Sequence, residues 1–381
     1  MSITPHEASA NSLPAESSPS VNAPLRSIHT DNFSAILQEL GVSLLVTTYQ
    51  AGKLVVLRPD GDRLNTHFRG FNKPMGLAVD GDRMAIGTSV EIWEYHNAPA
   101  VARQLEPVGS HDACFLPRSS VCTGDIQIHE MAWADASGGE SGISTQQEPE
   151  LWFVNTRFSC LCTRSNIHSF VPRWKPPFIS ALAPEDRCHL NGLCVVDGRP
   201  AFVTALGTTD TPGGWRDNKK CGGVLLEVET GEVVATGLSM PHSPRFYRGR
   251  LWVLDSGTGY LGHVDSEQGR FVPLTFCPGY LRGLTFVGDY AVVGLSRPRH
   301  DATFGGLALQ DELDRRKAGP QCGLHVIDLR SGDVVHWLRL EGEVSELYDV
   351  AVLPGVARPM LLGFQTDEIQ RMLAVDDEGT L

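Results

Sequence analysis

The sequence has little that would point to a membrane or to nucleic acid. No apolar run in its 381 residues approaches the roughly 20 residues that a membrane-spanning helix requires. The formal net charge is −13, and neither end carries a block of basic residues. Because such a surface repels phosphate backbones and anionic lipids, we expect neither nucleic acid nor a membrane as a partner.

Signals for export and for cysteine chemistry are also missing. Residues 1–30 are rich in Ser, Pro and Ala and lack the basic start and apolar stretch of a secretion signal, so they predict a disordered tail. The nine cysteines are scattered, and the closest pair, Cys160 and Cys162, suits neither a zinc ribbon nor a thioredoxin-type motif. These features predict reduced thiols in a cytoplasmic protein.

Several common catalytic motifs are absent as well. The chain contains no GxSxG nucleophile elbow, no P-loop and no HExxH zinc helix. Glu130 directly follows His129, which is not the zincin spacing. Chemistry based on a serine nucleophile therefore has no support.

What the sequence does contain is a repeated pair of turn signals. A single short helix is expected near the start, with Asp31 as N-cap, residues 35–40 as its body and Gly41 as terminator. Beyond it, β-rich runs alternate with two kinds of Gly-containing turn. Turns from an inner strand to its neighbour are Asp80-Gly81, Asp197-Gly198, Arg248-Gly249 and Gly288-Asp289; turns between outer strands are Asp60-Gly61, Thr230-Gly231, Gln268-Gly269 and Ser331-Gly332. Two tight hairpins per unit make the four-stranded meander of a propeller blade.

Six inner strands can be aligned by pattern. They are residues 76–79, 130–133, 192–195, 243–246, 283–286 and 349–352. The repeat predicts an all-β protein with a single six-bladed β-propeller over 31–381, with a β-sandwich as the alternative. The sequence does not decide whether residues 44–48 or residues 360–364 form the strand that closes the ring.

Two rings of residues are expected where the inner strands begin, around the mouth of the central channel. The position before each strand gives Met75, His129, Asn191, His242, Arg282 and Tyr348; the position two residues earlier gives Lys73, Gln127, His189, Met240, Tyr280 and Glu346. Three consecutive units thus bring His129, His189 and His242 to one mouth. Converging neutral imidazoles predict a site for one divalent transition metal, Zn, Fe or Cu, and the alternative is polar lining of a wet channel.

Candidate partners for this metal site lie nearby in the sequence. Glu130, Tyr348 and Glu346 are candidates for proton transfer. Asn191 could orient a ligand. Two long loops, 155–186 and 209–220, follow the histidine-bearing units and are expected to cover the site. Candidate substrate-binding residues are Arg282 and Arg245, with Arg157, Arg173, Arg216, Trp174 and Trp215 from these loops.

Several long strings resemble a family of bacterial conserved hypothetical proteins. They are 151–163, 169–193, 209–216, 237–245 and 250–259. The resemblance extends over nearly everything after residue 35, and it implies no activity. More loosely, the repeat is similar to six-bladed propellers of the gluconolactonase and strictosidine-synthase type. Those sites use acidic and Asn ligands, of which only Asn191 matches, so histidine-ligated propellers of the carotenoid-oxygenase kind are nearer in ligand type.

Together these patterns predict a metal-dependent enzyme acting on a small anionic molecule or a peptide group. Zinc would imply hydrolase, lyase or cyclase chemistry, and iron or copper would imply an oxygenase. The alternative is a non-catalytic propeller that serves as a binding or interaction scaffold.

Overall fold

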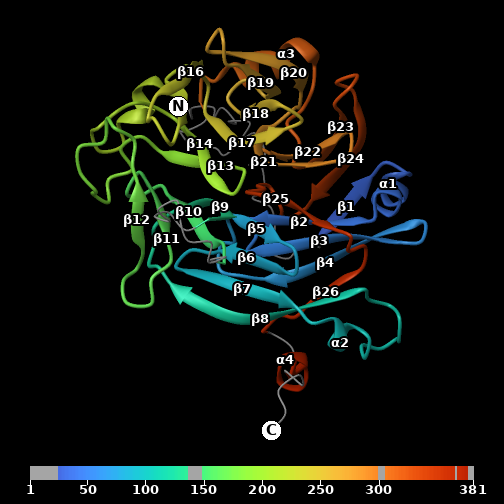
Figure 1. The fold of residues 1–381 in the computed structure, drawn as a ribbon. Helices are drawn as coiled ribbons and strands as arrows, with labels where there is room; N and C mark the ends of the chain where they lie inside the picture. Colours follow the sequence, from blue (N-terminus) through green and yellow to red (C-terminus); the bar gives the residue numbers. More distant parts are fainter. Residues whose placement is uncertain (1–24, 136–147, 299–304, 365–366, 376–381) are drawn as a thin grey trace, which may run out of the picture.

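The computed structural model describes residues 25–135, 148–298, 305–364 and 367–375. Six sheets, each built on an antiparallel four-stranded meander, stand around one axis, so the chain is a six-bladed β-propeller as predicted (Figure 1). None of the helices in these ranges combines the length and apolar character needed to cross a bilayer.

Each blade is a meander that runs outward from the axis. Blade 1 holds β5 (Leu77–Asp80), β6 (Arg83–Gly87), β7 (Glu91–Asn97) and β8 (Ala113–Cys122); blade 2 holds β9 (Ile128–Ala134), β10 (Glu150–Asn155), β11 (Cys160–Thr163) and β12 (Val171–Trp174). Blade 3 holds β13 (Leu190–Val196), β14 (Arg199–Ala205), β15 (Gly223–Glu227) and β16 (Val233–Leu238); blade 4 holds β17 (Pro241–Tyr247), β18 (Arg250–Asp255), β19 (Tyr260–Asp265) and β20 (Arg270–Phe276). Blade 5 holds β21 (Tyr280–Val287), β22 (Tyr290–Ser296), β23 (Gly323–Asp328) and β24 (Val334–Glu341). All these inner strands match the aligned positions, and both series of turns lie where they were expected.

Blade 6 closes the ring with strands from both ends of the chain. Its inner strand β25 (Val350–Pro354) pairs with β2 (Val42–Thr48), followed by β3 (Lys53–Asp60) and β4 (Arg63–Gly70). The open question is thereby settled in favour of 44–48. The competing segment forms β26 (Pro359–Leu361), which adds a parallel outer strand to β8 of blade 1.

The N-terminal predictions need two corrections. Strand β1 (Arg26–His29) pairs with β24, so a tail that extends to residue 30 is wrong for these four residues. Residues 1–24 lie outside the described part of the chain. Helix α1 (Phe33–Leu40) starts two residues earlier than expected, with Asn32 rather than Asp31 at the N-cap. Its terminator Gly41 is correct, because the φ of 64° favours glycine.

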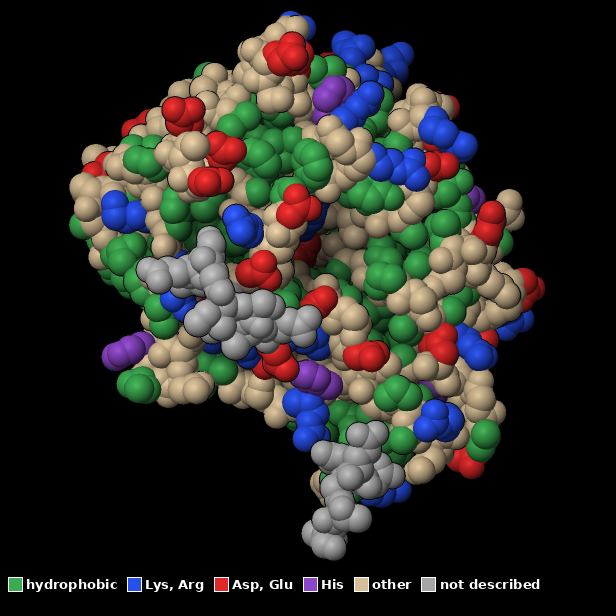
Figure 2. Space-filling view, viewed as in Figure 1, with side chains coloured by type: hydrophobic (Ala, Val, Ile, Leu, Met, Phe, Trp, Pro, Cys, Tyr) green, Lys and Arg blue, Asp and Glu red, His purple; other side chains and the backbone are tan. Residues whose placement is uncertain are grey.

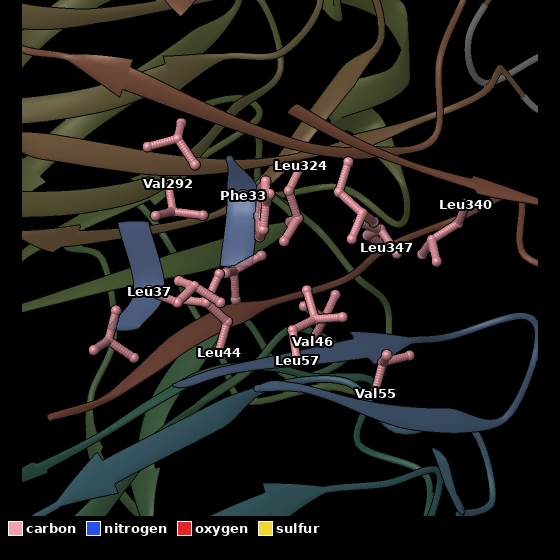
Figure 3. Packing of buried hydrophobic residues seen from close by; sticks show 14 of the residues in the cluster. Phe33, Leu37, Leu44, Val46, Val55, Leu57, Val292, Leu324, Leu340 and Leu347 are labelled. Atoms are coloured by element: carbon pink, nitrogen blue, oxygen red, sulfur yellow. The ribbon is translucent and has the colours of Figure 1, made fainter. Parts of the chain in front are cut away.

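The hydrophobic core consists of separate clusters, and several of them lie in the seams between neighbouring blades. At the seam of blades 5 and 6, α1 inserts Phe33 and Leu37 between the two sheets (Figure 3). Leu44 and Val46 of β2 meet Val292 of β22 in the same cluster. The short helix therefore seals the blade that is built from both chain ends.

Short helices lie outside the blades. They are α2 (Pro99–Ala102), the 3₁₀ turn η1 (Gly214–Asn218), α3 (Ala308–Arg316) and α4 (Glu368–Arg371). Around the axis, hydroxyl groups at the ends of second strands donate to carbonyl groups of the next blade. Examples are Thr156 to Leu190 at 2.6 Å and Ser296 to Leu347 at 3.0 Å. These bonds hold the starts of the inner strands in place around the channel, which is visible as a hollow with acidic side chains about it in Figure 2.

Candidate functional site

A cavity of about 400 Å³ lies at the end of the channel where the inner strands begin. Its walls include members of both predicted rings: Lys73, Met75, Gln127, His129, His189, Arg282 and Tyr348. Asp125 and Tyr49 also line it. The sequence therefore located this mouth correctly.

A repeated backbone turn directs side chains into the mouth. Lys73, Gln127, His189 and Met240, in four consecutive blades, have φ between 48° and 51°. A left-handed conformation is costly for residues other than glycine, so its repetition in four blades marks a constrained entry into the inner strand.

The turn in blade 2 fixes the ring of His129. Its Nδ1 lies 2.9 Å from the Gln127 carbonyl oxygen and 2.7 Å from Thr156 Oγ1. Because the Thr156 hydroxyl donates its own proton to Leu190, both neighbours of Nδ1 are acceptors, and Nδ1 carries the proton. Nε2 is therefore an unprotonated nitrogen. It is buried and has no hydrogen-bond partner.

Blade 4 repeats this arrangement at His242. Nδ1 lies 2.9 Å from the Met240 carbonyl oxygen and 3.3 Å from Ser256 Oγ, whose hydroxyl donates to Leu281. The Nε2 of His242 is again buried and without a partner. Two imidazoles in alternate blades thus present the same tautomer.

Both rings are held neutral. Burial, followed by His189 and Arg282, lowers the pKa of His129 well below its usual value. Burial, followed by Arg282, does the same for the pKa of His242. Neither Nε2 takes up a proton near neutral pH, because burial first, and then the positive charge of Arg282, disfavours a charged ring.

His189 is fixed by a carboxylate that the sequence analysis missed. Its Nδ1 lies 2.9 Å from Asp186 Oδ1, and Asp186 Oδ2 accepts a hydrogen bond from the Trp215 indole at 3.0 Å. The Trp215 ring packs 4.5 Å from the His189 ring, and Arg216 stacks on Trp215 at 4.3 Å. Segment 209–216 therefore lies at the histidine mouth, as expected for one of the two loops. The signal for Asp186 was its place three residues before His189.

The three histidines are near one another without forming a closed ligand cage. The rings of His129 and His189 are 5.1 Å apart, centre to centre, and nearly perpendicular. His242 does not line the cavity with them. Across the described ranges, no three His, Cys, Asp or Glu side chains are grouped closely enough to hold a metal ion.

The other half of the mouth carries cations and aromatic rings. The Arg282 guanidinium lies 5.1 Å from the centre of the Tyr348 ring, and Lys73 Nζ lies 5.8 Å from that of Tyr49. Tyr348 also packs 5.0 Å from His129 and donates its hydroxyl to the Ile128 carbonyl at 3.2 Å. Glu346 precedes β25 and is not among the residues that line the cavity.

Glu130 and Arg245 do not join the histidines. Arg245 Nη1 lies 2.9 Å from Glu130 Oε2, and Arg245 Nη2 lies 4.0 Å from Asp349 Oδ1. Arg245 lines a separate cavity of about 300 Å³, whose walls are the middle and far portions of the inner strands. These three residues, from blades 2, 4 and 6, form a charge triad across the channel, in which both carboxylates are buried and Arg245 is partly exposed.

Each triad member also bonds to the backbone of the next blade. Glu130 accepts the N–H of Leu193 at 2.8 Å, and Asp349 accepts that of Leu77 at 2.9 Å. Arg245 donates to the Leu284 carbonyl at 3.0 Å. The triad therefore links all six blades.

The remaining predicted residues are engaged elsewhere. Asn191 is buried in the interior, where it donates to the Pro241 carbonyl and accepts from the Thr204 hydroxyl. Arg157 pairs with Asp125 at the rim of the mouth at 3.0 Å. Arg173 and Trp174 lie on β12, the outermost strand of blade 2, where Arg173 pairs with Glu150 at 3.1 Å. The structure thus does not bring Arg173 and Trp174 to the channel mouth.

Comparison with solved structures supports the propeller fold. A chain from a nidogen/laminin complex is similar with a TM-score of 0.50 and 12% identity, covering 82% of this chain and 99% of that one. A protein of unknown function from Bacteroides caccae gives a TM-score of 0.49 and 10% identity, covering 82% and 98%. At these identities the first likeness shows the fold alone, and no curated protein matches.

One family model matches residues 31–362, which is nearly the whole propeller. This match agrees with the resemblance to conserved hypothetical proteins that the sequence strings indicated. The chain belongs to the DUF4915 family, a domain of unknown function.

Proposed function

We propose that the histidine mouth is the active site of a metal-dependent enzyme that acts on a small anionic molecule or a peptide group. His129, His189 and His242 would hold one divalent transition metal. The observation that carries the proposal is the pair of buried Nε2 atoms, on His129 and His242, that have no partner. An unpartnered buried nitrogen is costly, and a bound cation would remove that cost.

The tautomers suit metal binding. A metal-ligating histidine commonly donates its other ring N–H to a carbonyl or a carboxylate, which orients the ring and raises its basicity. His129 and His242 do so to carbonyl oxygens, and His189 does so to Asp186. All three rings therefore have Nε2 available as a ligand atom.

The spacing of two of the rings is also compatible. Two imidazoles on one tetrahedral ion, each with a metal–nitrogen distance of 2.0–2.1 Å, have ring centres roughly 5 Å apart. The centres of His129 and His189 are 5.1 Å apart. Recruiting His242 would require a side-chain shift, since the three are not already grouped around one point.

The chemistry that follows depends on the metal. Zinc would supply an activated water for hydrolase, lyase or cyclase chemistry, and iron or copper would support oxygen chemistry. Arg282 and Lys73 on the opposite wall would bind the anionic part of the substrate. Tyr348, within the cavity, and Glu346, close by in sequence, remain the candidates for proton transfer.

The nine unpaired cysteines are compatible with a cytoplasmic location.

A binding scaffold is the second candidate function. It is favoured by the lack of a preformed three-ligand group among the described side chains, and by the likeness to a propeller solved in a nidogen/laminin complex. In that case the histidines would bind ordered water in a polar channel.

Metal content separates the two functions. We expect tag-free protein to purify with about one equivalent of Zn, Fe or Cu, and we expect this to fall sharply in His129→Gln and His242→Gln variants. His325→Gln is the matched control, because His325 is also buried with an unpartnered ring nitrogen but belongs to β23 of blade 5. Protein without stoichiometric metal, or equal loss in the control, would favour the scaffold.

A further inference from the structure

A further cavity, of about 210 Å³, lies where blade 6 meets blade 1 near the C-terminal segment. It is lined by Arg58 at the end of β3, Ser110 and His111 before β8, and Arg358 before β26. Asp60 supplies the carboxylate among its lining residues. Three segments that are distant in sequence therefore present polar side chains to one small space.

The two arginines of this cavity have no acidic partner. Within the described ranges, no carboxylate oxygen lies within 4.0 Å of the guanidinium of Arg58 or Arg358, whereas most other arginines of the fold form such pairs. Arg58 uses Nε for the Asn65 side chain at 2.9 Å and Nη1 for the Pro359 carbonyl at 2.6 Å. Both acceptors are neutral, so the cationic charge of Arg58 is not balanced by direct contact.

A third arginine, Arg69, acts electrostatically on Arg58. Burial and then repulsion from Arg69 lower the pKa of Arg58, and Asp60 and Asp112 act in the opposite direction. Burial is also the main cause that lowers the pKa of His111, with smaller contributions from Arg58 and Arg358 in the same direction. Asp112, the nearby acid, has both carboxylate oxygens occupied at 2.8 Å by the backbone N–H groups of Ala357 and Arg358.

An additional donor is left unused. Ser110 Oγ is buried and has no hydrogen-bond partner. His111 points its Nδ1 to the Arg358 carbonyl at 3.2 Å, which holds the loop against the C-terminal segment. The cavity thus brings together one buried, unpartnered hydroxyl and two guanidinium groups that have no carboxylate partner in the described ranges.

We infer that this cavity binds a phosphate-type oxyanion, either inorganic phosphate or the phosphate of a monoester. Guanidinium groups bind such oxygens in a bidentate way, and the Ser110 hydroxyl adds a third donor. Since a water molecule occupies about 30 Å³ of liquid, a cavity of 210 Å³, about seven waters, is large enough for a phosphate group. Bound there, the anion would tie blade 6, the loop of blade 1 and the C-terminal segment together.

The test is thermal unfolding of the full chain in millimolar phosphate against chloride of the same ionic strength. We expect phosphate to raise Tm by about 2–4 °C, because a ligand that binds only the folded state stabilises it. Arg358→Gln should abolish the shift, and the C-terminal segment should stay in place because it is held by backbone atoms of residue 358. Arg103→Gln, at the exposed end of α2, is the matched control and should keep the shift.

A change of opposite sign makes the test sharper. Asp60→Asn removes the carboxylate of the lining, so phosphate should bind this variant more tightly than it binds the original chain. A larger shift with phenyl phosphate than with inorganic phosphate would identify a monoester as the ligand; a smaller one would identify the free ion. An equal Tm in phosphate and in chloride would overturn the inference. So would a phosphate-dependent rise in Tm that persists in Arg358→Gln.

Discussion

Asp186 accepts a hydrogen bond from His189 Nδ1 at 2.9 Å and thereby decides which nitrogen of that ring faces the cavity. The Trp215 indole holds the carboxylate from the other side at 3.0 Å. Asp186 is thus a positioning residue for His189, and the role can be tested without any knowledge of the substrate.

Replacing Asp186 by asparagine should weaken metal binding about 10–100-fold, because the amide no longer selects the tautomer or raises the basicity of the ring. A zinc competition titration measures the affinity. Asp210→Asn is the control, since Asp210 pairs with Arg187 in the adjoining loop and does not touch His189. Equal affinities for the original chain and Asp186→Asn would show that the pair has no part in metal binding.

A glycine connects the fold to the site. A Cβ added to Gly76 at the start of the first inner strand would lie 1.9 Å from the His129 carbonyl oxygen. Gly76→Ala should therefore destabilise the protein by about 1–3 kcal/mol and displace His129. Urea unfolding and metal content report the two effects. Gly319→Ala, which meets no atom within 4 Å, should change neither, and a tolerated Gly76→Ala would contradict the close packing of blades 1 and 2.

The charge triad should matter for stability and not for metal binding. Arg245→Met leaves Glu130 and Asp349 buried without their cation, at a cost of about 3–5 kcal/mol in the free energy of unfolding. In Glu130→Met/Arg245→Met the loss should be smaller than the sum of the two single losses. Metal content should stay unchanged in folded Arg245→Met. A stable variant that has lost its metal would instead connect Arg245 to the histidine mouth, where the sequence predicted it to bind substrate.

The triad should also affect how the free energy of unfolding depends on pH. Burial, then repulsion from Glu130, raises the pKa of Asp349 to about 7, partly offset by Arg245. Between its ordinary value of 3.8 and about 7 the folded state holds this proton more tightly than the unfolded state does. The contribution of Asp349 to stability therefore falls as pH rises through that window.

Asp349→Asn removes this contribution. Compared with the original chain, the free energy of unfolding of the variant should fall less, or rise more, between pH 4 and 7, whatever the absolute loss from the altered hydrogen bonds. Urea unfolding measures this free energy at each pH. Subtracting one pH profile from the other cancels the contributions of the other titrating groups. Parallel curves would mean that Asp349 is ionised throughout.

Much of the fold could be predicted because the information is local. Asp-Gly and Ser-Gly pairs mark tight turns wherever they occur, so the repeat and the inner strands follow from the sequence alone. Strand β2 and the segment that became β26 look alike locally, and only closure of the ring separates them. The pairing of β1 with β24 of blade 5 is likewise long-range, and no local sequence pattern predicts it.

The candidate site was predictable to the same extent. Position within the repeat brought His129, His189, Arg282 and Tyr348 to one mouth. It could not show that Glu130 turns away to meet Arg245, because that contact joins blades 2 and 4 across the axis. Trp174 was misplaced for a similar reason, since its segment forms the outer strand β12 and not a loop over the channel.

X-ray absorption at the metal edge of the tag-free protein is the most direct test of the histidine centre. We expect three imidazole nitrogens at about 2.0–2.1 Å from the metal in the original chain. After reconstitution with the same metal, His242→Gln should show two, and His325→Gln should still show three. A metal shell made only of oxygen atoms, or a spectrum that His242→Gln does not change, would contradict the assignment of the channel histidines as metal ligands.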